Sequence, residues 1–190
     1  MSIEEYKKIL EEKLTEKRYF HSLCVADEAK RLASLYGADC QKAYLAGLLH
    51  DITKNLPENQ HLKIFESFDI MLTDIEINAF KLWHAISGAA YLENVLKIED
   101  NEILTAIRYH TTARENMSLL EKVLYIADFT SLDRDYSDVD VMRKLSVDSL
   151  EDAMTYALKY TINELLGKNA AIHPDTLNAY NQLMLRIEEK

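Results

Sequence analysis

Apolar residues recur along this chain at the three- and four-residue spacing that is typical of amphipathic helices. Leu23, Leu32 and Leu35 lie in one long segment with this pattern, and Tyr44 and Leu48 lie in the next. The pattern predicts a helix from the N-terminus to about residue 15, helices over residues 16–36, 39–49, 73–80, 84–97, 101–110, 118–129 and 148–166, and a last helix from about residue 174.

Capping signals mark several of the predicted helix ends. Ser2–Glu5, Thr73–Glu76 and Ser118–Glu121 have the spacing of capping boxes, in which a hydroxyl accepts a backbone N–H and a glutamate reaches back. Gly37 is placed to end the second helix in the left-handed conformation. Pro174 suits the first turn of the last helix. These signals predict where helices begin and end, and they do so without reference to the hydrophobic pattern.

Composition narrows the fold class to all-α. The chain has 4 glycines and 2 prolines in 190 residues, too few for the tight turns of an all-β fold. A length of 190 residues suits one domain. Neither repeats nor linker-like segments are evident in the sequence. We therefore expect one domain over residues 1–190, with eight or nine helices, a core at about 15–135 and C-terminal helices at about 138–190.

The charge argues against nucleic acid polymers and membranes as partners. With 22 basic and 32 acidic residues, the net charge is −10, whereas phosphate backbones and anionic lipids attract basic surfaces. The longest uncharged stretch, 82–92, has eleven residues, where a membrane span needs about 20. The N-terminal residues do not resemble a secretory signal. Cys24 and Cys40 lie in helical segments and are interpreted as reduced packing residues. We expect a cytoplasmic protein.

Four histidines and two aspartates lie beside apolar residues on predicted helices, where each polar side chain needs a hydrogen bond, water or a metal. They are His21, His50, Asp51, His84, His110 and Asp128. Each histidine alone is more simply explained as a hydrogen-bonded core residue. Asp51 and Asp128, however, come near the C-terminal ends of helices, where a carboxylate opposes the helix dipole. Together the six favour one shared cation.

The order His21, His50-Asp51, Asp128 resembles the HD-domain metal-dependent phosphohydrolases, which are all-helical. The interposed His84 and His110 match the branch of that superfamily that carries two metals. The local contexts resemble the YqeK family of bacterial HD proteins from about residue 15 to 181. These contexts are Arg18-Tyr19-Phe20-His21, His50-Asp51-Ile52-Thr53-Lys54, Leu82-Trp83-His84-Ala85, Arg108-Tyr109-His110-Thr111-Thr112, Leu124-Tyr125-Ile126-Ala127-Asp128, Arg134 and Pro174-Asp175-Thr176.

This resemblance implies a hydrolase that cleaves diadenosine tetraphosphate symmetrically to two ADP at a di-iron centre. It implies that His21, His50, Asp51 and Asp128 hold one metal and that His84 and His110 hold the second, with Asp51 bridging. Nitrogen and oxygen ligands without thiolate also suit manganese, cobalt or zinc. Water activated by the metals would attack a phosphoanhydride. The metals and a few cations would then attract the polyanionic substrate locally, despite the acidic net charge.

Further residues are expected to act on the substrate. The catalytic set predicted beside the metals is Asp51, Lys54 and Arg134, and the substrate-binding set is Arg18, Lys54, Thr111, Thr112 and Arg134. Arg108 points away from His110 and is interpreted as structural. His61 is interpreted as a surface residue, and His173 as the start of the last helix with a possible second role as general acid.

Three alternatives stay open at this point. The same HD scaffold could hydrolyse mononucleotides, act as a mixed-valent di-iron oxygenase, or serve as a regulatory module with a vestigial metal site. The intact set of six ligands ranks the regulatory module last. A homodimer stays open as well, because a dimer face and a core face have the same amphipathic pattern.

Overall fold

The computed structural model describes residues 1–188, and side chains as far as residue 185. Within that range the chain is all-α, as predicted, and contains no strand. Its helices are α1 (Ile3–Lys13), α2 (Glu16–Tyr36), α3 (Cys40–Leu49), α4 (Glu58–Ser67), α5 (Asp74–Asn78), a 3-10 turn η1 (Phe80–Leu82), α6 (Trp83–Asn94), α7 (Asn101–Tyr109), α8 (Leu119–Thr130), α9 (Val139–Asp148), α10 (Leu150–Gly167) and α11 (Pro174–Glu188). Among the described residues, none of these helices is long and apolar enough to cross a membrane.

The predicted capping signals are confirmed. Ser2, Thr73 and Ser118 each accept a backbone N–H from the glutamate three residues later, and that glutamate reaches back to the backbone of the capping residue. Gly37 ends α2 with φ of 76°, in the left-handed region. Short-range hydrogen bonds therefore fix these ends, as the sequence predicted.

Two helices were not predicted, so the described helices exceed the expected eight or nine. α4 begins directly after Pro57, in a segment whose polar residues obscured its apolar positions. α9 is separated from α10 at Ser149, whose backbone is extended (φ −160°, ψ 118°) and whose side chain accepts from the N–H of Asp152. The helix predicted over residues 148–166 is therefore α10, and α9 is a separate helix that precedes it.

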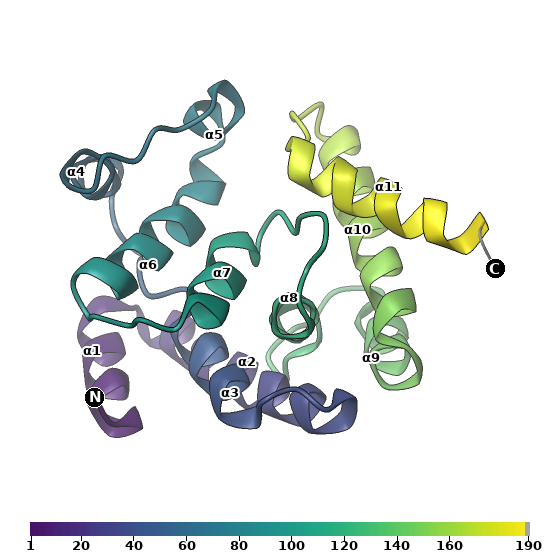
Figure 1. The fold of residues 1–190 in the computed structure, drawn as a ribbon, viewed down its shortest axis with the longest axis horizontal. Coiled ribbons are helices and arrows are strands. Elements are labelled where there is room, and N and C mark those ends of the chain that lie inside the picture. The colour runs from purple at the N-terminus through teal and green to yellow at the C-terminus, as the bar shows by residue number, and fades with distance from the viewer. Residues whose placement is uncertain (189–190) are drawn as a thin grey trace.

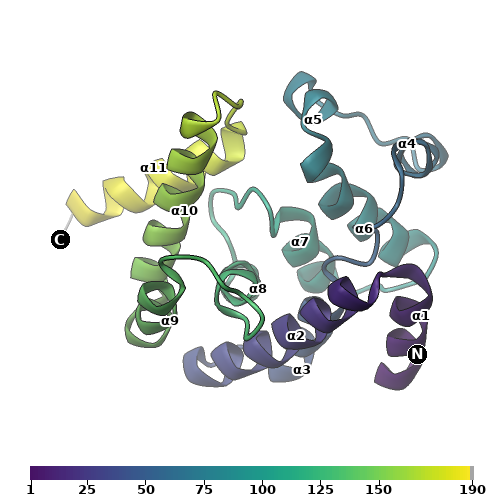
Figure 2. The ribbon, with the colours of Figure 1, turned by 180° about the vertical axis from the view of Figure 1, so that it is seen from behind.

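The centre of the molecule is formed by α2, α3, α7 and α8, which pack on one another, with α6 against α7. α9, α10 and α11 lie on one side of α8, and α4, α5 and α6 lie on the other side of the molecule (Figure 1). Seen from behind, α2 crosses the base of the molecule, and the two termini lie at opposite sides (Figure 2). Residues of the helices at the centre form most of one continuous apolar core.

The contact between α2 and α3 depends on Gly47. A Cβ atom added there would lie 2.8 Å from the Cα of Ala26 and 2.8 Å from the carbonyl oxygen of Val25. Both are backbone atoms of α2 and cannot rotate away. Only glycine allows these two helices to approach this closely, and the approach brings the middle of α2 beside the end of α3.

Gly47→Ala is expected to lower the free energy of unfolding by about 2 kcal/mol, because the two backbones must separate to admit the methyl group. Urea denaturation followed by circular dichroism measures this change. Gly167→Ala is the matched control, since a Cβ there meets nothing within 4 Å. Equal stability of the two variants would contradict the close contact.

Candidate metal centre

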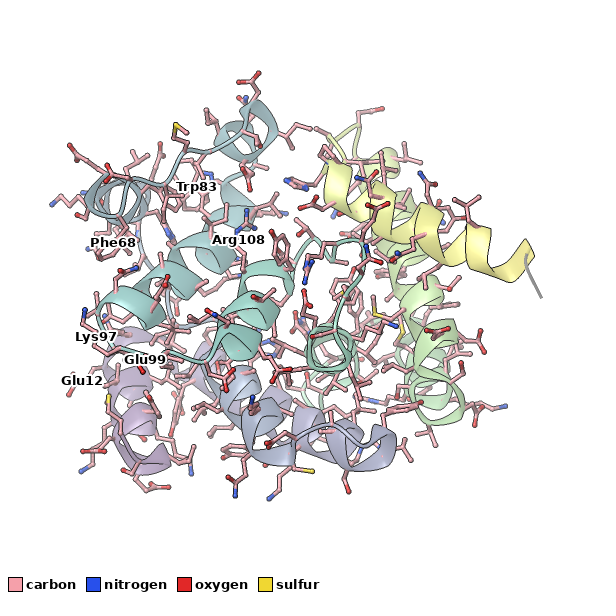
Figure 3. The ribbon with its side chains drawn as sticks, viewed as in Figure 1. Glu12, Phe68, Trp83, Lys97, Glu99 and Arg108 are labelled. Carbon is pink, nitrogen blue, oxygen red and sulfur yellow. The ribbon has the colours of Figure 1, made fainter. Side chains whose placement is uncertain are left out.

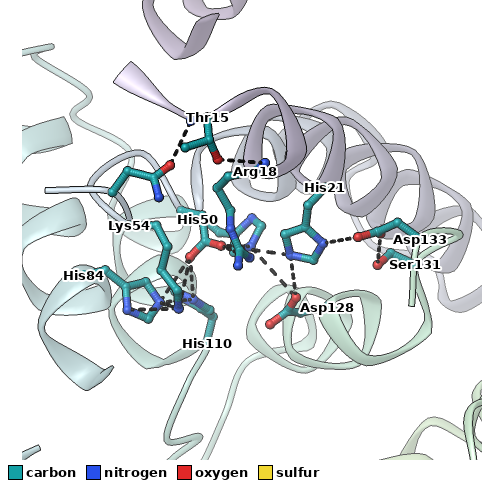
Figure 4. A network of polar contacts seen from close by, with 12 residues as sticks. Thr15, Arg18, His21, His50, Lys54, His84, His110, Asp128, Ser131 and Asp133 are labelled. Carbon is teal, nitrogen blue, oxygen red and sulfur yellow. Dashed lines mark hydrogen bonds and ion pairs between the residues drawn. The ribbon is translucent and has the colours of Figure 1, made fainter. Parts of the chain in front are cut away.

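The structure brings the six predicted ligand residues together where five helices meet (Figure 4). His21 lies in the second turn of α2, His50 and Asp51 follow α3, and His84 lies in the first turn of α6. His110 directly follows α7, and Asp128 lies in the last turn of α8. The first five are buried, and the Asp128 side chain is 20% exposed.

The two oxygens of Asp51 face different histidines. Its Oδ2 lies 3.4 Å from Nε2 of His50 and 4.0 Å from Nε2 of His21. Its Oδ1 lies 3.1 Å from Nε2 of His84 and 3.8 Å from Nε2 of His110. One carboxylate therefore stands between two groups of ligand atoms.

Asp128 completes the group that contains His21. Its Oδ1 lies 3.0 Å from Nε2 of His21 and 3.9 Å from Nε2 of His50. On the other side of Asp51, the Nε2 atoms of His84 and His110 are 3.1 Å apart. All four histidines thus present the same ring nitrogen to the centre.

The other ring nitrogens of two histidines are already occupied by backbone carbonyls. Nδ1 of His50 is 2.7 Å from the carbonyl oxygen of Gly47, and Nδ1 of His110 is 2.7 Å from that of Ile107. A carbonyl can only accept, so each Nδ1 carries a proton, and each Nε2 is the ring nitrogen left to bind a cation. Nε2 of His21, Nε2 of His50 and Oδ1 of Asp51 are buried, and none of them has a hydrogen-bond partner among the described residues. This donor set fits bound cations.

The protonation states also fit cations. Burial lowers the pKa of His84 and holds that of His110 well below its usual value, which keeps both rings neutral. Burial alone would raise the pKa of the Asp51 carboxyl, but neighbouring His50 and His84 hold it well below the usual range. Burial would likewise lower the pKa of His50, but Asp51 and Asp128 raise it. The centre therefore favours positive charge beside its carboxylates.

Three predicted cations border the same carboxylates. Arg18 donates to Oδ2 of Asp51 at 2.8 Å, and Lys54 lies 3.8 Å from Oδ1 of Asp51 and 3.0 Å from Nε2 of His84. Arg134 pairs with the side chain of Asp128. The side chains of these three cations are 30–35% exposed, so each reaches from the buried centre to solvent.

Of the other predicted residues, two threonines lie beside His110, and Arg108 and His173 lie near Glu76. Thr111 and Thr112 directly follow His110, and within the part of the chain that the structure describes their buried hydroxyls have no hydrogen-bond partner. Arg108 donates to Oε1 of Glu76 at 2.6 Å, away from the centre, in agreement with its structural interpretation. His173 comes just before α11, with its Nε2 3.8 Å from the same Glu76 oxygen.

The interpretation of His61 as a surface residue was wrong. Its exposed fraction is 1%, and Nδ1 lies 2.8 Å from the hydroxyl of Ser87. Its ring packs on Phe65 of α4 and on Trp83, the first residue of α6 (Figure 3). Burial lowers the pKa of His61 to about 4. The unpredicted helix α4 places this side chain inside the protein, whereas a polar loop would have left it in water.

Asp133 is the functional candidate that the sequence did not indicate. Its Oδ2 lies 2.8 Å from Nδ1 of His21, on the ring edge opposite the centre. It follows α8 in a loop, where aspartates are common for other reasons. Its spacing of five residues from Asp128 is the one signal that could have drawn attention to it.

Comparison with known proteins agrees with this arrangement. Residues 18–133 match the family model described as HD domain. A protein of Halalkalibacterium halodurans named "Bis(5'-nucleosyl)-tetraphosphatase, symmetrical" is 43% identical and covers 90% of this chain and 91% of its own. A protein of Bacillus subtilis with the same name is 38% identical, over 97% of this chain and 98% of its own.

A solved structure from Clostridium acetobutylicum, described as a predicted HD superfamily hydrolase involved in NAD metabolism, is also similar. It has a TM-score of 0.94 and 39% sequence identity, and the match covers 98% of both chains. The family model alone spans more than half of this chain, and these relatives extend the likeness over nearly all of it. The chain therefore belongs to the HD domain family, and within it to the family of the proteins named symmetrical bis(5'-nucleosyl)-tetraphosphatase.

Proposed function

We propose that this protein hydrolyses diadenosine tetraphosphate symmetrically to two ADP, using two divalent metal ions. The position of Asp51, with one oxygen toward His50 and the other toward His84, carries the proposal. A carboxylate so placed suits a bridge between two ions. The names of relatives at 43% and 38% identity, both symmetrical bis(5'-nucleosyl)-tetraphosphatases, support the choice of substrate.

In this proposal His21, His50, Asp51 and Asp128 hold one ion, and His84 and His110 hold the other with Asp51 shared. Two such ions would lower the pKa of a shared water and neutralise charge that develops on the phosphate oxygens. Imidazole and carboxylate donors without thiolate suit iron, manganese, cobalt or zinc. We propose iron, by the family resemblance.

The cations of the chain orient the polyphosphate. Arg18, Lys54 and Arg134 are partly exposed beside the ligand carboxylates, so their charged ends are available to the phosphate oxygens of a substrate. These three positive charges are gathered at the site. They can therefore attract a polyanionic substrate there, although the whole protein has a net charge of −10. The hydroxyls of Thr111 and Thr112 supply two neutral donors next to His110.

The reaction consumes one water. The water oxygen forms a bond to one of the two central phosphorus atoms, and the bond from that phosphorus to the central bridging oxygen breaks. The bridging oxygen leaves on one ADP, and the protons of the water pass to solvent or to the leaving group. Because a terminal phosphate is a good leaving group, the chain needs no strong proton donor.

The partner, cellular location and oligomeric state of the enzyme are the remaining parts of the proposed function. The net charge of −10 supports a small nucleotide rather than a nucleic acid polymer as partner. We propose a cytoplasmic location, and one HD domain over the chain. Size-exclusion chromatography with light scattering would decide between a monomer and the homodimer that the sequence leaves open.

The decisive experiment is purification without oxygen, a metal count, and an assay of diadenosine tetraphosphate with and without ferrous iron. About two metals per chain and ADP as the only nucleotide product are expected. AMP plus ATP would overturn the symmetrical cleavage. Faster turnover of ATP, GTP or deoxynucleotides would favour a mononucleotide phosphohydrolase, and oxygen consumption with a diol would favour an oxygenase. Metal without turnover of any nucleotide would favour a regulatory module.

Arg134→Lys tests the phosphate contacts. Lysine keeps the positive charge beside Asp128 but loses the planar fork that binds two phosphate oxygens at once. We expect kcat/KM to fall by about 10- to 100-fold, the size of one or two charge-assisted hydrogen bonds. Arg31→Lys is the matched control, because the exposed Arg31 side chain also pairs with a carboxylate, that of Glu28. Unchanged kinetics, with the metal content verified, would remove Arg134 from the site.

A further inference from the structure

His21 differs from two other histidines of the centre in the partner of its outer ring nitrogen. His50 and His110 each donate from Nδ1 to a neutral backbone carbonyl of their own helix. His21 instead has a carboxylate there, since Oδ2 of Asp133 lies 2.8 Å from its Nδ1 (Figure 4). A carboxylate accepts, so the Nδ1 of His21 donates to Asp133, and Nε2 is the ring nitrogen that faces the centre.

Asp133 is itself held in place. Its second oxygen accepts from the hydroxyl of Ser131 at 2.8 Å. Ser131 caps the C-terminal end of α8, where its N–H donates to the carbonyl oxygen of Ala127 at 2.9 Å. The end of α8 therefore fixes Asp133 through Ser131 and also carries Asp128. The short segment 128–133 thus positions both Asp128, beside Nε2 of His21, and Asp133, beside its Nδ1.

We propose that Asp133 is a positioning residue that orients His21 and strengthens it as a ligand, so that the metal position formed by His21 and Asp128 depends on the charge of Asp133. This inference rests on the ligand set given under the proposed function. An imidazole that donates to a carboxylate carries more electron density on its other nitrogen than one that donates to an amide. Removing such a partner typically weakens metal binding by about 10- to 100-fold.

The inference predicts an asymmetric loss of metal. Neither His84 nor His110 contacts Asp133, so the position that they form should keep its affinity. Asp133→Asn keeps an atom that can accept from Nδ1 of His21 but removes the negative charge. Asp133→Ala removes both. Ser131→Ala keeps the charge of the Asp133 carboxylate but removes the hydroxyl that orients it. Its effect on metal affinity should therefore be the smallest of the three.

The experiment is a titration of chelator-treated protein with Co²⁺, followed by calorimetry and by the visible absorption of the bound ion. Wild type is expected to bind two Co²⁺ per chain. In Asp133→Asn and Asp133→Ala, one of the two is expected to bind about 10- to 100-fold more weakly, with altered absorption bands, while the other stays within about twofold. Asp135→Asn is the matched control, because it removes a charge from the same loop at an exposed position.

Three outcomes would overturn the inference: unchanged Co²⁺ affinity in Asp133→Asn and Asp133→Ala, equal weakening of both ions, or the same loss in Asp135→Asn. Thermal melting of the metal-free variants separates a ligand effect from poor folding, and Ser131→Ala provides a second test if the Asp133 variants do not fold. A wild-type protein that binds no Co²⁺ would instead refute the ligand set of the proposed function. A wild type that binds two ions but leaves diadenosine tetraphosphate intact would refute only the substrate.

Discussion

Asp51→Asn is expected to lower kcat/KM for diadenosine tetraphosphate by at least about 10³-fold, the equivalent of roughly 4 kcal/mol in transition-state stabilisation. Asp51 offers one oxygen to each of the two ligand groups, at 3.4 Å from His50 and 3.1 Å from His84. An amide offers one neutral oxygen and cannot serve both. The metal content should therefore fall from about two ions per chain to below one.

Asp27→Asn is the control for this variant, because it removes a negative charge from an exposed position on the same helix that carries His21. Product analysis by chromatography and a metal count on each protein provide the comparison. Circular dichroism of the metal-free chains shows whether both variants fold. An Asp51→Asn protein that retains two ions and its turnover would refute Asp51 as the shared ligand, whatever the fate of the other five residues.

The sequence predicted the helix ends with local caps because those hydrogen bonds span only three or four residues. The hydroxyl of Ser118 accepts the N–H of Glu121 at 3.2 Å, and the Glu121 carboxylate accepts the N–H of Ser118 at 2.7 Å. The helix α9 was missed for the opposite reason. No side-chain cap marks its start at Asp138, whereas the hydroxyl of Ser149 caps the predicted helix that follows it.

The site was predictable only in part from its residues. Apolar neighbours show that His21 and Asp128 need partners, but nothing local says that α2 and α8 bring them within 3.0 Å of each other. The family resemblance supplied that pairing, because it compares order along the whole chain. Asp133 stayed hidden because its role depends on the direction of one ring nitrogen of His21, and spacing along the sequence does not encode that direction.

His61 shows how polar neighbours can mislead. Gln60 directly precedes it and Lys63 follows two residues later, and both suggest a solvated face. The informative signal is Phe65, four residues later, because residues four apart share one face of a helix. In the structure His61 and Phe65 are both buried on the same side of α4. A helical interpretation of residues 58–67 would therefore have placed His61 in the core.

The buried His61 ends a directed chain of hydrogen bonds that reaches the metal centre. Thr53 donates its only hydroxyl proton to the carbonyl oxygen of His84 at 2.8 Å, so it must accept from Ser87 at 2.9 Å. Ser87 has then used its own proton and must accept from Nδ1 of His61 at 2.8 Å. Nδ1 of His61 therefore carries a proton, and because burial lowers the pKa of this ring to about 4, the ring is neutral at pH 7.

This neutral state makes the stability of the fold depend on pH. Burial lowers the pKa of His61 from 6.5 to about 4. Between these values the unfolded chain binds a proton at this residue and the folded chain does not, so stability is full above pH 6.5 and falls as the pH decreases toward 4. The loss is about 1.4 kcal/mol for each pH unit, and about 3 kcal/mol at pH 4.

Comparison with His61→Asn isolates this contribution, because an asparagine amide can donate to Ser87 but does not titrate. Urea denaturation of both metal-free proteins between pH 7 and 4 gives two curves in which the other histidines titrate alike. The wild type should be the more stable at pH 7, and its advantage should shrink by about 3 kcal/mol by pH 4. A difference in unfolding free energy that stays constant over this range would mean that His61 is protonated as readily in the folded protein as in the unfolded chain, and the buried neutral ring would have to be abandoned.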